Sequence, residues 1–361
     1  MTQPAVDAPT GAPPPVAPVR PRRRPWRVVA VVAASALGAA AIGANFIRVP
    51  YIITSPGEAT ALDAEIVSIT GAPTYRRDED LLFLTVRVSN RDPSLWRYLF
   101  AQLDDDVSVE PREEIIGCQS YEESTRLNDL LMRESQDAAT TVALRQLGYE
   151  VVEESSRVVI EDVQCDGPSR GRLMAGDVVT AVDGTPVAVG DDVRPRVLAH
   201  SPGERLRVTV DRGGETRDVT VRLGTREGAA FMGIAFQTVT EKRFPFEVAI
   251  DTRRVSGPSA GLAFTLAIID ELTPGDLTGN QRVAVTGSIR PDGVVERVGG
   301  VPQKTVTARE RRVSLMLVPR GEAREARPHA EGMRVVAVGT IDEALEALRR
   351  AGGDPVEIPD Q

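Results

Sequence analysis

The chain has 361 residues, of which 42% are hydrophobic and 26% are charged. This composition is typical of a chain that buries hydrophobic cores, so it excludes wholesale disorder, and the length predicts two or three domains. The formal charge is −9, yet residues 1–50 carry +5, so residues 51–361 carry −14. An acidic body of that size excludes proteins that bind nucleic acid through clustered positive charge. With only two histidines, His200 and His329, and no C-x-x-C pair, we expect no metal site and no cofactor.

The basic residues are almost all arginine. Of the 43 basic residues 41 are arginine, and the two lysines are Lys242 and Lys304. Arginine keeps its proton in a protein, whereas a desolvated lysine can lose it. The lysines are therefore the basic side chains that could accept a proton near neutral pH. Lys242 lies in a charged turn, Glu241–Pro245, and is assigned no role.

The N-terminal segment predicts a tail followed by a membrane anchor. Residues 1–27 predict a disordered cytoplasmic tail, because the segment begins with a Pro- and Ala-rich stretch that has no hydrophobic period. Five arginines between Arg20 and Arg27 precede an apolar run that predicts a transmembrane helix over residues 28–48, since twenty residues of helix span about 30 Å. Positive charge stays on the cytoplasmic side, so a single pass through the plasma membrane would leave residues 51–361 extracytoplasmic.

Two alternatives exist for the apolar run. Ala39-Ala40-Ala41 resembles the cleavage site of a signal peptide, but the 27-residue leader and the twenty-residue run are both long for such a peptide. A buried helix of a soluble protein fits poorly with five arginines next to an uncharged stretch. We therefore expect an uncleaved anchor.

Cys118 and Cys165 are the only cysteines. An extracytoplasmic setting permits a disulfide between them, which would close a loop of roughly 46 residues and contribute about 3–4 kcal/mol if unstrained. Two separate buried thiols are the alternative.

The rest of the chain predicts three further regions, so the fold class is multidomain. The first, residues 51–155, is strand-rich, with strands near 64–69 and 82–88. Leucines and valines at spacings of three and four over residues 121–147 predict a helix, and Gly148 suits its C-terminal end. No catalytic arrangement is visible in this strand-rich region plus helix.

Residues 157–225 predict a region of short strands and turns with a helix near 191–199. The pattern of its middle stretch is Leu173, Gly176-Asp177, Val179, Val182-Asp183-Gly184 and Pro186-Val187. This pattern resembles the PDZ domain of bacterial proteases, which implies a PDZ-like β-barrel/α module that binds an extended peptide as an added strand. The residues before its first strand, Glu154–Arg157, lack the glycines with which that family cradles a terminal carboxylate, so such capture is left open. A spacer that binds nothing is the alternative.

The third region, residues 229–351, carries the candidate chemistry. Val255–Gly261 reads V-S-G-P-S-A-G and leads into an apolar stretch, which predicts a helix over residues 259–272 with Ser259 in its first turn. Unpaired N–H groups and the positive end of the helix dipole meet at such a turn, so they could stabilise an alkoxide and form an oxyanion hole. Taken alone, this motif is a moderate signal, because a serine near a helix start is usually only a cap.

A serine nucleophile needs a base, and Lys304 suits this role better than either histidine. It follows Gly299-Gly300 in the first turn of a helix that is predicted to run to about Arg311. The helix dipole disfavours a cation there, and Val301 and Val306 would desolvate the amine. Both effects would lower the pKa of Lys304 toward the range in which it accepts a proton.

Four motifs in order, G-P-S-A-G, V-A-V-T-G-x-I, D-G-x-V and G-G-V-x-x-K, resemble the proteolytic domain of the Lon family of serine peptidases. The resemblance covers about residues 229–351 and implies an α+β Lon-type proteolytic domain with a Ser–Lys dyad. Residue by residue, Ser259 matches the nucleophile, Lys304 matches the general base, and Thr286 matches the threonine that holds the lysine. It further implies protein or peptide substrates and a homo-oligomeric ring, with a hexamer suspected.

The sequence departs from ATP-dependent Lon in three respects. No ATPase domain precedes the peptidase and no P-loop motif occurs, so we expect an ATP-independent endopeptidase acting on unfolded or membrane-proximal chains. Ser288 stands where the ATP-dependent enzymes usually have glutamate, and the interval from Ser259 to Lys304 is slightly longer. The order of segments resembles the membrane-anchored, PDZ-containing Lon-like proteases of Gram-positive bacteria.

Two other functions are compatible with parts of the sequence. The first is a catalytically inactive scaffold that presents the PDZ-like module at the membrane, although such a scaffold has no reason to keep Ser259, Thr286 and Lys304 together. The second is another Ser–Lys enzyme, such as a signal peptidase or a penicillin-binding protein. The latter needs S-x-x-K, and Val301 and Val239 stand three residues before the two lysines.

Overall fold

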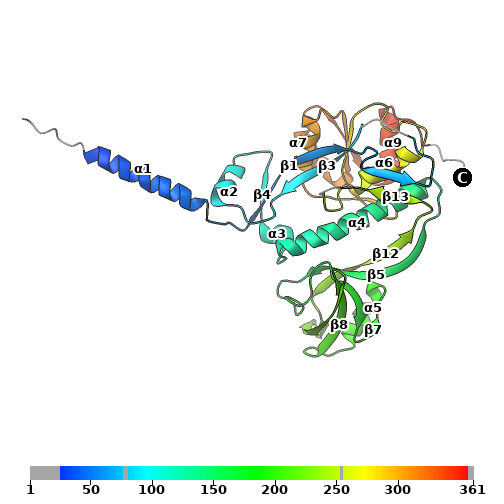
Figure 1. The fold of residues 1–361 in the computed structure, drawn as a ribbon, viewed down its shortest axis with the longest axis horizontal. Helices are drawn as coiled ribbons and strands as arrows, with labels where there is room; N and C mark the ends of the chain where they lie inside the picture. The colour runs from blue at the N-terminus through cyan, green and yellow to red at the C-terminus, as the bar shows by residue number, and fades with distance from the viewer. Residues whose placement is uncertain (1–24, 76–79, 253–254, 357–361) are drawn as a thin grey trace, which may run out of the picture. The chain divides into compact units, whose positions relative to one another are not determined.

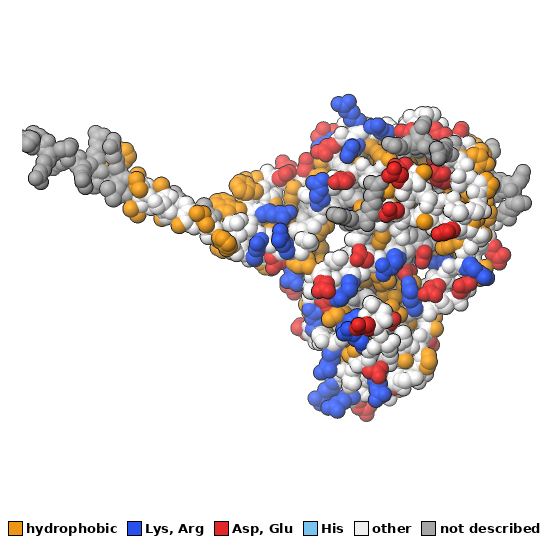
Figure 2. Space-filling view, viewed as in Figure 1, with side chains coloured by type: hydrophobic (Ala, Val, Ile, Leu, Met, Phe, Trp, Pro, Cys, Tyr) orange, Lys and Arg blue, Asp and Glu red, His pale blue; other side chains and the backbone are white. Residues whose placement is uncertain are grey.

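The computed structural model describes residues 25–75, 80–252 and 255–356, and it divides the chain into two compact units at Ile47. The first unit contains helix α1 (Pro25–Ala44), and most of its side chains that the structure describes are exposed and apolar (Figures 1 and 2). Of the transmembrane helix predicted at residues 28–48, residues 28–44 are helical, and the helix ends at Ala44. However, among the described residues no helix is at once long and apolar enough to cross a membrane. Residues 1–24 of the predicted tail lie outside the described residues.

Six strands from both ends of the second unit form one sheet, in the order β18-β17-β14-β3-β1-β4. Strands β3, β14, β17 and β18 run parallel, and β1 is antiparallel to both of its neighbours. The predicted strand-rich region and the predicted proteolytic region therefore share a sheet. The strands are β1 (Tyr51–Ala61), β3 (Leu81–Val88), β4 (Ser108–Pro111), β14 (Val283–Val285), β17 (Leu315–Pro319) and β18 (Arg334–Val338).

Helices cover both faces of this sheet (Figure 1). In β14, Val283 and Val285 face one hydrophobic core, and Ala284 faces the other, because side chains alternate along a strand. We expected an α+β domain, and the structure has a mostly parallel sheet between two helical layers. The first layer holds α4 (Tyr121–Gln146), α6 (Gly261–Leu272) and α9 (Ile341–Ala351), and the second holds α7 (Val301–Glu310) and α8 (Ala323–Ala326).

Shorter elements complete the fold, and one of them differs from the prediction. The strand expected at 64–69 begins at Val67, because the Asp63 carboxylate accepts hydrogen bonds from the N–H groups of Glu65 and Ile66 and holds them in a turn. The V-A-V-T-G-x-I motif forms two strands, because β14 ends at Val285 and β15 begins at Ser288, with Gly287 at φ +143° between them. The shorter elements are α2 (Leu95–Ala101), α3 (Arg112–Ile116), β2 (Val67–Thr70), β13 (Glu247–Ile250), β15 (Ser288–Ile289), β16 (Val295–Glu296) and the 3-10 helices Arg320–Glu322 and Arg327–His329.

A second sheet has the order β12-β5-β6-β8-β9, with β7 paired to β6. A cluster of buried valines and leucines fills its core, and the Arg212–Glu215 hairpin turns at two glycines with positive φ. The predicted helix near 191–199 is confirmed as α5. The elements are β5 (Val152–Val163), β6 (Val178–Val182), β7 (Thr185–Pro186), α5 (Gly190–Leu198), β8 (Arg205–Arg212), β9 (Glu215–Arg222), β10 (Gly224–Arg226), β11 (Ala229–Phe231) and β12 (Ile234–Arg243).

The second sheet is an insertion into the first fold. The chain enters it after α4 and returns at β13, which pairs with β2 of the N-terminal region. β12 pairs with β5 from Ile234 opposite Val163 to Arg243 opposite Val152. The sequence division at residue 229 therefore falls inside this insertion, since β12 completes its sheet.

Helix α4 contacts both sheets. Leu130 packs with Val159 of β5 and Val239 of β12, and Glu134 pairs with Arg157 at 3.4 Å. The C-terminal half of α4, from Ala138 to Leu144, lies in the core of the six-stranded sheet. One helix therefore supports the inserted sheet and the domain that surrounds it.

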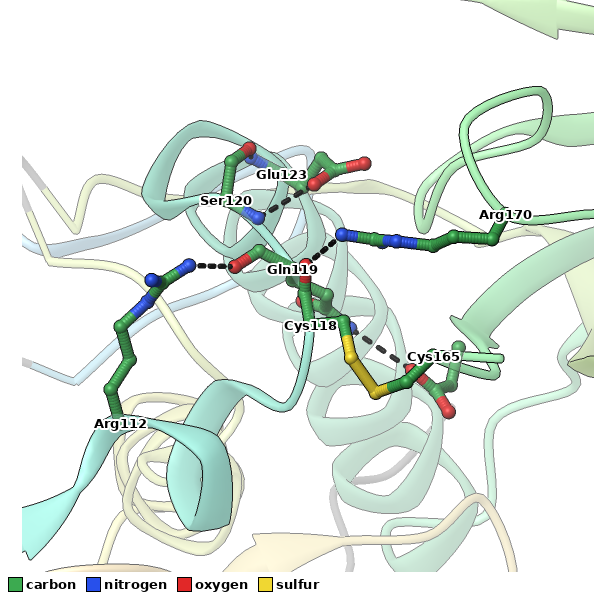
Figure 3. The surroundings of a disulfide bond; sticks show 8 residues. Arg112, Cys118, Gln119, Ser120, Glu123, Cys165 and Arg170 are labelled. Atoms are coloured by element: carbon green, nitrogen blue, oxygen red, sulfur yellow. Dashed lines mark hydrogen bonds between the residues drawn. A yellow bond between two sulfur atoms is a disulfide. The ribbon is translucent and has the colours of Figure 1, made fainter. Parts of the chain in front are cut away.

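A disulfide joins Cys118 to Cys165, with their Cα atoms 5.4 Å apart (Figure 3). Cys118 precedes α4, and Cys165 follows β5, so the bond ties the insertion to the start of α4. Arg170 also donates to the Cys118 carbonyl oxygen. Of the two alternatives for the cysteines, the structure confirms the disulfide.

Candidate active site

Ser259 lies two residues before helix α6, in the turn that leads into it. The helix begins at Gly261 with Ala260 as its N-cap, so the serine is not in the first turn as predicted. Two hydrogen bonds fix this start, and in the first the Gly261 N–H donates to the Pro258 carbonyl at 3.2 Å and closes a turn there. The Leu262 N–H donates to the Gly287 carbonyl at 3.0 Å. These two N–H groups are therefore already bonded and cannot serve as oxyanion donors.

The segment before Ser259 is held by α4. The Gly257 N–H donates to the Asn128 carbonyl at 3.0 Å, and the Ser135 hydroxyl donates to the Pro258 carbonyl, also at 3.0 Å. Gly257 has φ +95°, a conformation that favours glycine. Both bonds join residues more than a hundred positions apart in the sequence. The supporting role of α4, including Ser135, was missed because no local pattern signals it.

The carbonyl of Ser259 is bonded to the end of β14. It accepts the Gly287 N–H at 3.0 Å and the Thr286 hydroxyl at 3.3 Å. Thr286 is completely buried. The structure therefore brings two of the three predicted site residues, Ser259 and Thr286, into direct contact at the carboxyl end of a central strand. Open α/β sheets commonly place ligand sites at this edge.

Lys304 is buried on helix α7. The helix starts after Gly300, which has φ +69° and whose added Cβ would lie 2.7 Å from Val86. The Lys304 N–H donates to the Gly300 carbonyl at 2.9 Å, and its side chain is among the largest fully buried ones, with the residue 1% exposed. Burial lowers the pKa of Lys304 from 10.5 to about 8, against an opposing effect of the Glu322 charge. The amine can therefore lose its proton near neutral pH, as the sequence predicts.

Helix α6, which follows Ser259, and helix α7, which carries Lys304, pack in different layers of the sheet. Among the described residues, no hydrogen bond joins the Lys304 amine to the Ser259 hydroxyl. Such bonds are often long before substrate binds. The predicted dyad therefore stays a prediction.

Glu322 is a buried carboxylate that sequence analysis did not single out. It is 2% exposed and ends the 3-10 helix Arg320–Glu322 that follows β17, and its two oxygens accept the Val298 N–H at 3.0 and 3.1 Å. Arg297 lies 3.6 Å away, but its side chain is 71% exposed. A glutamate three residues after an apolar strand gives no sign of burial, since such positions are commonly solvated.

Neither histidine has a place in this arrangement. His200 lies in the inserted sheet's region, between the Asp183 carboxylate at 2.8 Å and the Glu204 carboxylate at 3.0 Å, and the hydrogen bond that its ring donates to Asp183 raises its pKa. His329 belongs to a 3-10 helix after α8. In the described ranges, no three His, Cys, Asp or Glu side chains are grouped so that they could hold a metal ion.

Strand β12 lies at an edge of the inserted sheet, beside α5. The Gly190 N–H at the start of α5 donates to the Thr238 hydroxyl at 2.9 Å, and an added Cβ at Gly190 would lie 2.5 Å from the Phe236 ring. Gly233, with φ +74°, precedes the strand. Glu154–Arg157, considered above for carboxylate capture, lie within β5 and not before it, and this part of the strand pairs with β12.

Comparison with known proteins defines the class of both parts. Residues 146–223 match the family described as "PDZ domain", and residues 231–360 match the family described as "Lon protease (S16) C-terminal proteolytic domain". The chain thus combines a PDZ domain with a Lon-type proteolytic domain, which indicates a serine peptidase.

Several curated relatives are themselves Lon proteases. "Lon protease" of Phenylobacterium zucineum is 28% identical over 51% of this chain, and "Lon protease" of Clostridioides difficile is 38% identical over 27%. "Lon protease 2" of Thermus thermophilus is 23% identical over 78%. The chain spans only 23%, 13% and 37% of the lengths of these three proteins.

A solved structure is similar to part of the chain. The PDZ domain of the SdrC-like protein from Listeria innocua shares 22% identity, with a TM-score of 0.21, and the match covers 22% of this chain and 92% of that one.

Proposed function

We propose that this chain is an ATP-independent serine endopeptidase in which Ser259 is the nucleophile and Lys304 is the general base. The observation that carries the proposal is the burial of Lys304, since a pKa of about 8 leaves a useful fraction of free amine near neutral pH. The match of residues 231–360 to a Lon proteolytic domain supports it.

The proposed reaction needs one proton acceptor. The Ser259 hydroxyl oxygen would attack the scissile carbonyl carbon while its proton passes to the Lys304 amine. The C–N bond would then break, and Lys304 would return the proton to the leaving amine, which leaves an ester on Ser259. Water would attack that ester as Lys304 accepts its proton, and the proton would go back to the serine oxygen as the new carboxyl group leaves. Thr286 would orient the lysine while its hydroxyl contacts the Ser259 carbonyl.

Three variants test the catalytic assignment. Ser259→Ala and Lys304→Arg should each abolish hydrolysis of a casein-like substrate and labelling by a serine-reactive probe, because the first removes the nucleophile and the second keeps the charge but removes the base. Lys242→Arg is the matched control and should keep full activity. Hydrolysis by Lys304→Arg at the normal rate would overturn the dyad, and a wild-type chain that binds peptide without cleaving it would favour a scaffold.

The PDZ domain would recruit extended or unfolded segments. The free edge of β12 can accept a peptide as an added strand, with α5 forming the second wall. An extended peptide added to the Ser259→Ala chain should therefore perturb backbone amide signals of β12. Perturbation confined to the other edge strand, β9, would contradict this site.

We also propose that residues 51–361 are extracytoplasmic. The Cys118–Cys165 disulfide supports this location, because disulfides persist in oxidising compartments. Attachment through the N-terminal segment and assembly into a hexamer stay predictions from the sequence. Carbonate extraction of cell membranes would test attachment, and sedimentation of the purified chain would test assembly. A chain that carbonate releases from the membrane would contradict attachment. A chain that sediments as a monomer at working concentration would contradict assembly into a hexamer.

A further inference from the structure

We infer that Glu322 is a positioning residue for the proposed catalysis: it fixes the start of helix α7 and sets a buried carboxylate beside the helix that carries Lys304. This inference rests on the proposed function, since it names a second group that governs the same base. Glu322 touches no reacting atom in it.

Glu322 lies against the start of α7. Its carboxylate accepts the Val298 N–H with both oxygens, at 3.0 and 3.1 Å, and Val298 stands two residues before the glycine that begins the helix. Ala323, the next residue, packs in the same core as Val301 and Ala308 of α7. Glu322 therefore anchors the loop from which the helix carrying Lys304 starts.

Glu322 places a carboxylate in a buried part of the domain. A carboxylate that is 2% exposed must be compensated, because burial without partners is costly. One backbone N–H compensates part of the charge, and Arg297 adds little, since its side chain is 71% exposed and its ion pair is screened by water. Burial accordingly raises the pKa of Glu322.

The charge of Glu322 also acts on Lys304. The charged groups that act on Glu322 are Arg297 before α7 and Glu325 on α8, and both side chains are more than half exposed. The charge of Glu322 raises the pKa of the buried Lys304 amine, against the larger effect of burial. Without it, the amine would be unprotonated over a wider pH range, but it would also be a weaker base.

The substitution Glu322→Gln separates the two effects. The glutamine side-chain oxygen can still accept the Val298 N–H, whereas the charge is lost. Glu325→Gln is the matched control, because it neutralises a carboxylate on the neighbouring helix whose side chain is 52% exposed. Glu322→Leu loses both the charge and the acceptor, so it reports the structural effect.

The lysine titration can be measured without turnover. The chain has only two lysines, so ¹³C-labelled lysine in the full chain gives two sets of signals, and Lys304→Arg assigns them. In Glu322→Gln the Lys304 midpoint should move to lower pH by roughly one pH unit, while the Lys242 signal stays in place. An unchanged Lys304 midpoint in a folded variant would overturn the inference.

The pH dependence of hydrolysis gives a second readout. Glu322→Gln should cleave several-fold faster than wild type near pH 6, because more of Lys304 is unprotonated, and slower on the alkaline plateau, because the base is weaker. A merely structural role predicts a loss at every pH, as expected for Glu322→Leu. If Glu322→Gln fails to fold, the Glu322→Asp variant keeps the charge and should titrate as wild type, and a shifted midpoint there would contradict the inference. Hydrolysis that survives in the Ser259→Ala chain would instead contradict the proposed function, whatever the titration shows.

Discussion

At the scale of single residues, the candidate site depends on a lysine that the fold has removed from water. Lowering its pKa from 10.5 to about 8 corresponds to about 3 kcal/mol of unfavourable free energy for the protonated amine. An arginine could not respond in this way, because it would stay protonated and buried. This is the physical basis for a lysine at position 304 in a chain where 41 of the 43 basic residues are arginine.

The cost of burying Lys304 should appear in the stability of the protein. Because the pKa of the folded state lies below that of the unfolded state, the unfolded chain binds more protons between about pH 8 and 10.5. The penalty is therefore complete below about pH 8 and disappears as the pH rises toward 10.5. Lys304→Met should raise the free energy of unfolding at pH 7 by up to about 3 kcal/mol, and the gain should shrink at pH 10.

Urea unfolding of the full chain at both pH values measures this effect. Lys242→Met serves as the control, since that lysine lies in a charged strand end of the inserted sheet. A Lys304→Met chain that is no more stable than wild type at pH 7 would mean that the amine is not held in a low-dielectric place.

At the scale of elements, the start of α6 is fixed by close contacts with α4 and β15. An added Cβ at Gly261 would lie 2.7 Å from the Ser135 hydroxyl and 3.1 Å from the Ile289 nitrogen. The second contact is with backbone and cannot relax by a rotamer change. The glycine therefore lets three elements meet within two residues of Ser259.

Gly261→Ala should displace the turn that carries Ser259. We expect a loss of about 1–3 kcal/mol in stability from the overpacking and a fall in kcat of about a hundredfold, because misplacement of a reacting group by about 1 Å costs that much. Peptide hydrolysis and thermal unfolding measure the two effects. Gly224→Ala is the control, since its Cβ would make only ordinary contacts at 3.4 Å and beyond. Equal kcat values for the Gly261→Ala and Gly224→Ala chains would refute the role given to this contact.

At the scale of the whole molecule, the domain around the candidate site is assembled from both sides of an inserted PDZ sheet. β3 pairs with β14, although some two hundred residues separate them, and β2 pairs with β13 across the insertion. Helix α4 joins the two parts, because Leu130 packs against β5 and β12 while Ser135 holds the turn before Ser259. The N-terminal strands are therefore part of the domain that carries the site.

The sequence predicts those features that depend on neighbours in the chain. The helix at 121–147, the strand at 82–88 and the αL glycine at position 148 all follow from local spacing and turn chemistry, and the structure has each of them. Motif order is likewise local enough to single out Ser259 and Lys304.

Features that depend on contacts between distant parts of the chain cannot be predicted from local sequence patterns. The helix predicted at 259 begins at 261, because the carbonyls of Pro258 and Gly287 take its first N–H groups. The burial of Glu322 depends on its contact with Val298 of another loop. The β12–β5 pairing spans the insertion, and no period in either strand identifies its partner.

The central claim is that the free amine of Lys304 is the base that activates Ser259. The most direct measurement compares two midpoints in the same full chain: the ¹³C titration of Lys304 and the pH dependence of Ser259 labelling by a serine-reactive probe. The account predicts that both midpoints fall near pH 8 and that Lys304→Arg eliminates the labelling. A lysine that titrates near 10.5 while Ser259 is labelled undiminished at neutral pH would contradict it.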